Sequence, residues 1–257
     1  MMDYKTIRFA ESENVGTITL NRPERLNAIN EAMVKDLSEC IGYCSTNSDI
    51  RAIVITGEGR AFCSGGDVLE MEPSRLDSVL DALNSMLLQI RSVPKPVIAA
   101  VNGSAVGGGF ALALACDIVV AATKAKFNAQ WVIIGLPSDC GMSYMLPRLV
   151  GDKRAAWLML TGEMIDAYKG HEMGVVNQVV KDDQLLSVTE GLARRFAMSA
   201  TLATGAIKEL LQRSHGETIE GQMAYEKKLF ARLILTDDHR EALAAFHEKR
   251  KPVFRGR

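Results

Sequence analysis

The chain has almost no net charge, because its 257 residues carry 30 Lys and Arg against 31 Asp and Glu. Both signs are mixed along the sequence. A nucleic acid or an anionic membrane surface attracts a protein through a concentrated basic face, so we expect neither partner. The length and the 47% of apolar residues fit one good-sized domain with a small appendage at most.

Charged residues are missing altogether between Lys95 and Asp117. A run of that length is long enough to span a bilayer. However, PVIAAVNGSAVGGGFALALAC contains Asn102, Ser104 and four glycines, which divide it into short pieces instead of one uniform helix. The N-terminus, MMDYKTIRF, carries charge where a secretory signal has its apolar core. We therefore expect a cytoplasmic protein without a membrane span.

Closely paired cysteines are lacking as well. The five cysteines are scattered and have no nearby histidines of the kind that complete a zinc site. We expect reduced core thiols and no metal. Every histidine lies in the last third of the chain, so a Ser–His or Cys–His nucleophile is poorly supported and surface or interface roles are expected. These histidines are His171, His215, His239 and His247.

Short apolar runs alternate with helical patterns in the first two-thirds of the chain. Apolar residues recur every three or four positions over 31–41 and 76–90, which predicts two amphipathic helices. The alternation of strands and helices predicts a layered α/β architecture. Four runs rich in β-branched residues have the length of strands: 15–20, 52–56, 97–101 and 117–122.

From about residue 182 onward the strand pattern ends and only helical patterns follow. They are LLSVTEGLARRFAM, ATGAIKELLQRS, TIEGQMAYEKKLFARLIL and REALAAFHEKR. One face of this region is too apolar for a free tail, so it must pack on the α/β core or on another subunit. We place the core at residues 1–195 and the helical C-terminal region at residues 196–257.

Two glycine-rich turns follow predicted strands. Gly65 and Gly66 lie in AFCSGGDVLEM, and residues 107–109 lie in NGSAVGGGFALALACD. Glycine lets the backbone approach a ligand, and N–H groups at a helix start lack internal partners and gain from the helix dipole. One N–H from each turn can therefore stabilise a shared oxyanion. The alternative is two tight turns without a ligand, since neither contains a dinucleotide or P-loop motif in frame.

Five segments, in order and over nearly the whole chain, resemble the crotonase superfamily of enoyl-CoA hydratases and isomerases. They are NRPERLNAIN, AFCSGGDVLEM, KPVIAAVNGSAVGGGFALALACD, IGLPSDCGMSYMLPRLVG and LFARLILTDDHREALAAFHEKRKPVF. The resemblance implies an α/β fold with a crotonase-like ββα spiral core and a C-terminal helical trimerisation region. It further implies a homotrimer or a dimer of trimers.

The same resemblance implies acyl-CoA thioester substrates. Coenzyme A would arrive as part of the substrate, with no permanently bound cofactor. It also implies an oxyanion hole that stabilises a thioester enolate through two backbone N–H groups. At the matching positions these donors are Gly66 and Gly108.

The residues available as general acid and base differ from the hydratase pattern. Hydratases of this family have two glutamates in the pocket, and the matching positions here read Ala111 and Trp131. Addition of water needs one group that deprotonates it and one that protonates the α-carbon, so the usual hydratase mechanism is in doubt. Asp139, in GLPSDCG, matches an aspartate of phenylacetate-degradation isomerases and 4-chlorobenzoyl-CoA dehalogenases. It is our catalytic candidate, and the alternative is a helix N-cap.

A single carboxylate can act in two ways. As a base it moves a proton between two carbons of the acyl chain and shifts a double bond. As a nucleophile it forms an ester that water hydrolyses. The spacing of Trp131 and Asp139 resembles that of the dehalogenases, but the position of their water-activating histidine reads Leu88. We expect an enoyl-CoA isomerase, with a hydratase or hydrolase and a silent CoA-ester-binding protein as alternatives.

The resemblance also implies substrate-binding residues. Arg25 would meet a phosphate, and the backbone near Ala28 and Ser64 would meet adenine. Phe230 and Lys249 would reach the nucleotide bound to a neighbouring subunit. The remaining predicted substrate contacts are Asp67, Val68, Leu69 and Trp131.

Three acidic residues follow the first glycine turn. We expect Asp67 to order its loop through hydrogen bonds. Glu70 and Glu72 are either charges that stay in solvent or residues that enter a mobile pocket at a later stage.

Overall fold

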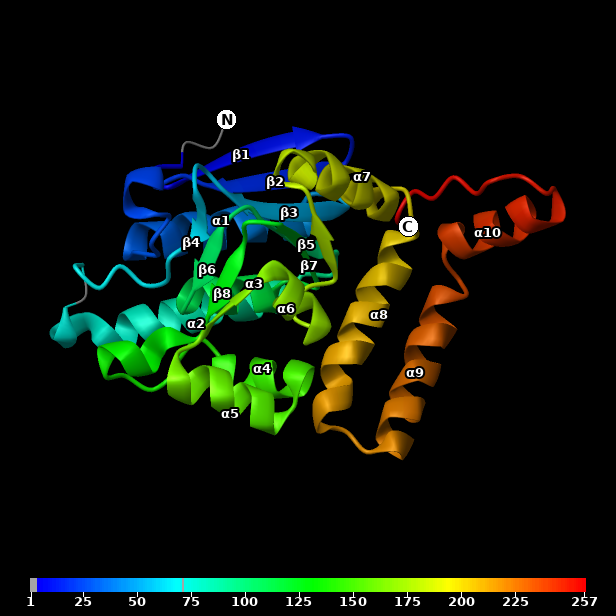
Figure 1. Cartoon of the computed structure of the whole chain (residues 1–257). Helices are drawn as coiled ribbons and strands as arrows, with labels where there is room; N and C mark the ends of the chain where they lie inside the picture. The colour runs from blue at the N-terminus through cyan, green and yellow to red at the C-terminus, as the bar shows by residue number, and fades with distance from the viewer. Residues whose placement is uncertain (1–3, 71) are drawn as a thin grey trace.

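A computed structural model describes residues 4–70 and 72–257, and its largest element is a six-stranded sheet (Figure 1). The first two strands pair antiparallel, and every other neighbouring pair in this sheet is parallel. In spatial order the strands are β1 (Ile7–Ser12), β2 (Val15–Leu20), β3 (Ala52–Gly57), β5 (Val97–Val101), β7 (Ile118–Ala122) and β10 (Gln178–Val180).

A second sheet of four short strands lies beside the first. Its first three strands are parallel and the last pair is antiparallel. Each of β3, β5 and β7 is followed by one of these short strands and then by a helix, which is the predicted ββα repeat. The strands, in spatial order, are β4 (Ala61–Cys63), β6 (Ser104–Val106), β8 (Lys126–Asn128) and β9 (Met164–Asp166).

The long parallel strands are buried on both faces, which explains their continuous apolar runs. Alternate residues of β3 divide between two clusters: Ile53 and Ile55 join the larger core, whereas Val54 joins a smaller cluster on the other face. Helices α1 (Glu31–Thr46), α2 (Leu76–Ser92) and α3 (Gly108–Ala115) contribute to the larger core. Helix α7 (Leu185–Ala197) covers the opposite face (Figure 1).

The uncharged stretch that precedes Asp117 lies inside the molecule as β5, β6 and α3. All eight residues of α3 are buried. In the described part of the chain no helix combines the length and the apolar character needed to cross a bilayer. The uncharged run is therefore part of the buried core of an α/β fold.

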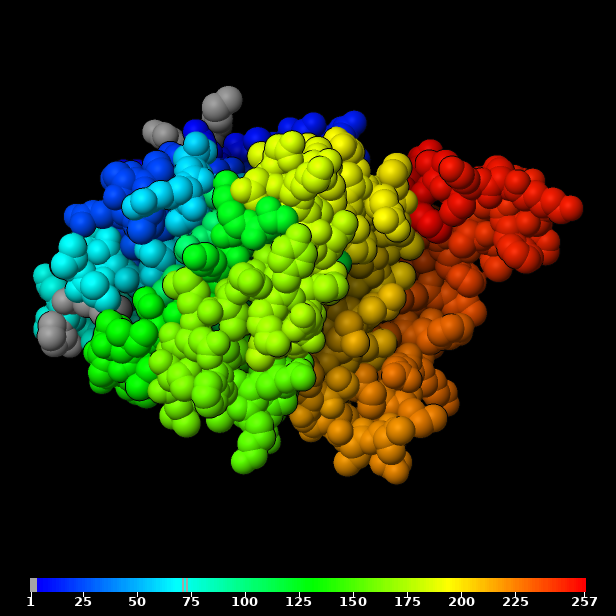
Figure 2. All heavy atoms as spheres, in the orientation of Figure 1, coloured from blue at the N-terminus to red at the C-terminus, as the bar shows by residue number. Residues whose placement is uncertain are grey.

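Helices α4 (Met142–Val150), α5 (Asp152–Thr161) and α6 (Ala167–Glu172) follow β8 and complete the lower part of the core in Figure 1. The C-terminal region consists of α8 (Thr201–Arg213), α9 (Ile219–Leu233) and α10 (Asp237–His247). Helices α8 and α9 form a pair beside the core, and α10 extends away from it (Figures 1 and 2).

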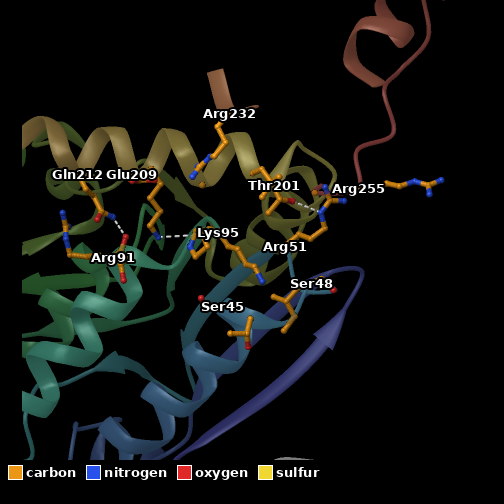
Figure 3. Close-up of a pocket in the computed structure, with 18 residues that line it drawn as sticks. Ser45, Ser48, Arg51, Arg91, Lys95, Thr201, Glu209, Gln212, Arg232 and Arg255 are labelled. Carbon is orange, nitrogen blue, oxygen red and sulfur yellow. Dashed lines mark hydrogen bonds between the residues drawn. The ribbon is translucent and has the colours of Figure 1, made fainter. Parts of the chain in front are cut away.

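Buried cations join the C-terminal region to the core across a cleft of about 520 Å³ (Figure 3). Arg51 donates to Thr201 Oγ1 at 2.7 Å, to the Ser199 carbonyl at 2.6 Å and to the carbonyl of Phe254 at 3.0 Å. Lys208 Nζ bonds Asp117 Oδ2 at 2.7 Å and the Ile90 carbonyl near the end of α2 at 2.9 Å. These cations therefore neutralise a carboxylate and satisfy carbonyl groups of the fold itself.

Large apolar side chains remain exposed on α9, on α10 and in the turn between them. Phe230 is 70% exposed, Leu235 73% and Phe246 80%. Apolar surface of this extent marks a contact face. The predicted trimer would cover such a face, and the assembly itself stays a prediction.

Candidate active site

A cavity of about 680 Å³ lies between the start of α1, the loop after β4, helix α2, the start of α3 and the segment before α4. Its volume is typical of a small-molecule site. It brings together most of the residues predicted from the sequence: Arg25, Ala28, Ser64, Gly66, Asp67, Val68, Leu69, Gly108, Trp131 and Asp139.

The two glycine turns meet at one wall of this cavity. Gly65 and Gly107 have φ values of +98° and +52°, which favour glycine because a side chain is strained there. A β-carbon built on Gly108 would lie 3.7 Å from the Gly66 nitrogen. A β-carbon on Gly109 would lie 2.1 Å from the Cys63 carbonyl oxygen, so α3 begins in direct contact with the end of β4.

Hydrogen bonds around the turns leave two N–H groups for a ligand. The Ile29 N–H donates to the Gly65 carbonyl at 2.7 Å, and the Asp67 N–H donates to the Ile29 carbonyl at 2.8 Å. Among the residues described, no acceptor is recorded for the N–H of Gly66 or of Gly108, which begins α3. Two unpaired donors that border the same space have the arrangement of an oxyanion hole.

Asp139 lies in the segment before α4 and lines the same cavity. Its Oδ1 atom is buried and has no hydrogen-bond partner within the described chain. The alternative interpretation as a helix N-cap is wrong, because Gly141 holds that position and no side chain caps α4. A buried carboxylate oxygen without a partner is costly for stability alone, which favours a role toward a ligand.

The carboxylate of Asp139 also affects its neighbour. Burial and the charge of Asp139 raise the pKa of the Cys140 thiol well above its usual range. Burial likewise raises the pKa of Cys63 to about 12. Both thiols are therefore kept protonated at neutral pH, which is the state of an inert core cysteine.

The hydratase positions hold no carboxylate here. Ala111 is completely buried in α3 and does not line the cavity. Trp131, in the short helix η3 (Gln130–Ile134), is 8% exposed and forms part of the wall. Leu88, the position of the dehalogenase histidine, is 63% exposed on α2 and lies outside the lining.

Other carboxylates at the cavity have partners or lie open to solvent. Glu31 pairs with Arg75 at 2.7 Å, and both Asp67 and Glu70 pair with Arg22. Glu72 is exposed. Arg22 lies in the segment NRPERLNAIN, but nothing in the sequence around it predicts that it contacts these carboxylates.

Two predicted contacts lie elsewhere. Phe230 is on α9 and Lys249 follows α10, and neither lines the cavity. Their proposed contact involves the nucleotide bound to a neighbouring subunit, so it stays a prediction. The described residues contain no group of three or more His, Cys, Asp or Glu side chains placed to hold a metal ion.

A ββα spiral with two unpaired backbone N–H groups beside a carboxylate defines an enzyme of the crotonase type. The family model for enoyl-CoA hydratase/isomerase matches residues 10–257, and the chain belongs to this family. The 1,2-epoxyphenylacetyl-CoA isomerase of Escherichia coli K12 is 38% identical over 252 residues, which cover 95% of this chain and 96% of that protein.

Relatives named as hydratases are equally similar. A probable enoyl-CoA hydratase of Rhodobacter capsulatus is 40% identical over 259 residues and covers both chains completely. The crystal structure of an enoyl-CoA hydratase from Bacillus anthracis superposes with a TM-score of 0.95 at 30% identity, covering 98% of this chain and 100% of that one. The common conclusion is an enzyme of the enoyl-CoA hydratase/isomerase family.

Proposed function

We propose that this enzyme is an enoyl-CoA isomerase in which Asp139 is the single acid and base. The observation that carries the proposal is the buried Oδ1 of Asp139, which lacks a partner in the described chain and lines the same cavity as Gly66 and Gly108. The relative from Escherichia coli is named as an isomerase of a CoA thioester, which supports isomerisation over hydration as the class of reaction. The missing carboxylates at Ala111 and Trp131 count against hydration by two glutamates.

The reaction begins with a 3-enoyl thioester whose carbonyl oxygen accepts hydrogen bonds from the Gly66 and Gly108 N–H groups. The Asp139 carboxylate removes a proton from C2, and the electron pair of that C–H bond forms a dienolate. Negative charge develops on the thioester oxygen, where the two N–H groups stabilise it more strongly than they stabilise the ground-state carbonyl. Protonated Asp139 then donates its proton to C4, which leaves the double bond between C2 and C3 and restores the carboxylate.

The lining supports an uncharged, apolar acyl group. Residues from α1 and α2 form an aliphatic part of the wall, and Trp131 adds an aromatic ring. A carboxylate on the acyl group would need a cation. Of the two arginines in the lining, Arg75 is already paired with Glu31, and Arg25 is assigned to the coenzyme A part. The aliphatic residues are Val34, Leu76, Val79, Leu80 and Leu83.

Arg25, at the mouth of the cavity, is exposed and suited to binding a phosphate of the coenzyme A part.

The five cysteines are all free and buried, which supports the expected cytoplasmic location.

The test is the Asp139→Asn variant, assayed for conversion of 3-enoyl-CoA to 2-enoyl-CoA. We expect kcat to fall by about 10² or more, as for removal of a general base. The matched control is Asp183→Asn, at an exposed aspartate outside the cavity, which should retain full turnover.

Three results would contradict the proposal. Unchanged turnover in Asp139→Asn would remove the role of this residue. Hydration of crotonyl-CoA by the unmodified enzyme, with a kcat of about 10 s⁻¹ or more, would indicate a hydratase. Tight binding of CoA esters without turnover of any of them would indicate a silent binding protein.

A further inference from the structure

A buried arginine lies beneath the first glycine turn. The Arg22 side chain is 11% exposed, and its guanidinium contacts both segments that form this turn. Nη1 donates to the Ala28 carbonyl at 2.6 Å. Nη2 donates to Asp67 Oδ2 at 3.0 Å and to Glu70 Oε1 at 2.9 Å. One planar group thus ties the chain before α1 to the loop after β4.

The Ala28 contact leads to Gly66 through two peptide groups in series. In a trans peptide the C=O and the following N–H lie in one plane and point in opposite directions. Arg22 binds the C=O of the peptide that joins Ala28 to Ile29, and the N–H of this peptide donates to the Gly65 carbonyl at 2.7 Å. The peptide that joins Gly65 to Gly66 is held by its C=O in turn, so the Gly66 N–H must point away from Ile29.

The contact with Asp67 fixes the other side of the same glycine. The Asp67 N–H donates to the Ile29 carbonyl at 2.8 Å, and its carboxylate, 5% exposed, accepts from Arg22. Gly66 has no side chain of its own that could hold the peptide in place. Its orientation therefore depends on the bonds made on either side of it.

We infer that Arg22 is a positioning residue of the oxyanion hole, which orients and polarises the Gly66 N–H through the Ala28–Ile29 and Gly65–Gly66 peptides. Hydrogen bonds in series strengthen one another, so a cationic donor at the start makes the last N–H a better donor. The carboxylates of Asp67 and Glu70 keep the guanidinium in place. The inference rests on the proposed use of Gly66 as an oxyanion donor.

The first variant is Arg22→Lys. Lysine keeps a positive charge beside the buried Asp67, but its single ammonium group lacks the planar fork that reaches Ala28 and both carboxylates together. Because the oxyanion forms only after substrate binding, we expect kcat to fall between about tenfold and 10², with KM changed less than about threefold. The control is Arg194→Lys, at the exposed ion pair with Glu13, which should leave both constants unchanged.

A spectroscopic measurement separates positioning from a merely structural role. A bound acyl-CoA with a ¹³C-labelled thioester carbonyl should show an infrared band shifted to lower frequency by the two N–H donors. We expect this shift to be smaller in Arg22→Lys, and to be retained in Arg194→Lys and in Asp139→Asn. The band does not depend on which reaction Asp139 performs, so failure of the isomerase proposal and failure of this inference give different results.

Wild-type kcat together with a wild-type carbonyl band in Arg22→Lys would overturn the inference. A loss of thermal stability or a rise in KM with an unchanged band would also overturn it, because Arg22 would then be structural or would bind substrate directly. If Arg22→Lys does not fold, Asp67→Ala replaces it. This variant removes the buried carboxylate that holds Arg22 Nη2, so the guanidinium loses its fixed position and the band shift should decrease. An unchanged band in Asp67→Ala would count against the inference as well.

Discussion

The two walls of the cavity are built in different ways. The oxyanion wall consists of backbone groups at Gly66 and Gly108, and the peptides next to them are bonded into the fold at 2.7 to 3.0 Å. The second wall consists of side chains, notably Trp131 and Asp139, and adjoins the first. Asp139 has an oxygen without a partner in the described chain, and Val132, Ile133 and Ile134, which follow Trp131 in η3, are exposed.

This difference separates what the fold provides from what individual side chains decide. The oxyanion wall follows from the positions of β4, β6 and α3, and under the proposed function it would stabilise an enolate whatever reaction produces it. The chemistry that follows depends on which side chains face the acyl group. Relatives with the same fold can therefore be named either isomerases or hydratases.

The strongest test of the oxyanion wall is Gly108→Ala. The added methyl group would lie 3.7 Å from the Gly66 nitrogen, Cys140 Sγ and Ile29 Cδ1, which are ordinary contacts, so the protein should fold. The methyl group nevertheless occupies the space between the two donors. We expect kcat to fall by about 10² to 10³, comparable to loss of an oxyanion donor, with an unchanged melting temperature.

The matched control is Gly42→Ala, on the exposed side of α1, where an added β-carbon meets nothing within 4 Å. Alanine is favoured over glycine within a helix by roughly 0.5–1 kcal/mol, so this variant should be slightly more stable and fully active. Equal activity of the two variants would show that the space between Gly66 and Gly108 is not used.

Strands β2, β3, β5 and β7 could be predicted from the sequence, whereas β1, whose residues are mostly exposed, and the short strands could not. Residues 15–20, 52–56 and 97–101 are rich in β-branched and apolar residues and agree closely with β2, β3 and β5. The three-residue strands β4, β6, β8 and β9 are too short to show a period. They exist because chain segments far apart in sequence pair with one another, as Ala61 does with Ser104.

The same limit applies to the site. The glycine turns and Asp139 carry recognisable local motifs. Arg22 has no such signal, because its function depends on Asp67, which lies 45 positions away in the sequence. The N-cap alternative for Asp139 could be rejected only once α4 was seen to begin at Met142.

A smaller effect is expected at the side-chain wall from Trp131→Ala. Removal of this ring, 8% exposed in the cavity wall, takes away apolar contact with the acyl group in the ground state and the transition state alike. We expect KM to rise about tenfold, equivalent to about 1.4 kcal/mol, with little change in kcat. The other tryptophan, Trp157, is 61% exposed on α5, and Trp157→Ala serves as the control.

A large fall in kcat without a change in KM would mean that Trp131 takes part in the chemistry. Tryptophan fluorescence offers a second measurement. Quenching by a bound acyl-CoA should disappear in Trp131→Ala and persist in Trp157→Ala.

The smallest effect concerns the cysteine beside Asp139. Because burial and the Asp139 charge raise the Cys140 pKa, its thiolate fraction between pH 7 and 9 lies below that of an ordinary cysteine. We expect slow alkylation by iodoacetamide, measured by peptide mass spectrometry, and no loss of activity over this pH range. Asp139→Asn removes one cause of the raised pKa, so Cys140 should react somewhat faster in that variant. Rapid alkylation of the unmodified enzyme, with loss of turnover, would instead indicate that the Cys140 thiolate is the nucleophile of the site. Asp139 would then act as the partner of Cys140.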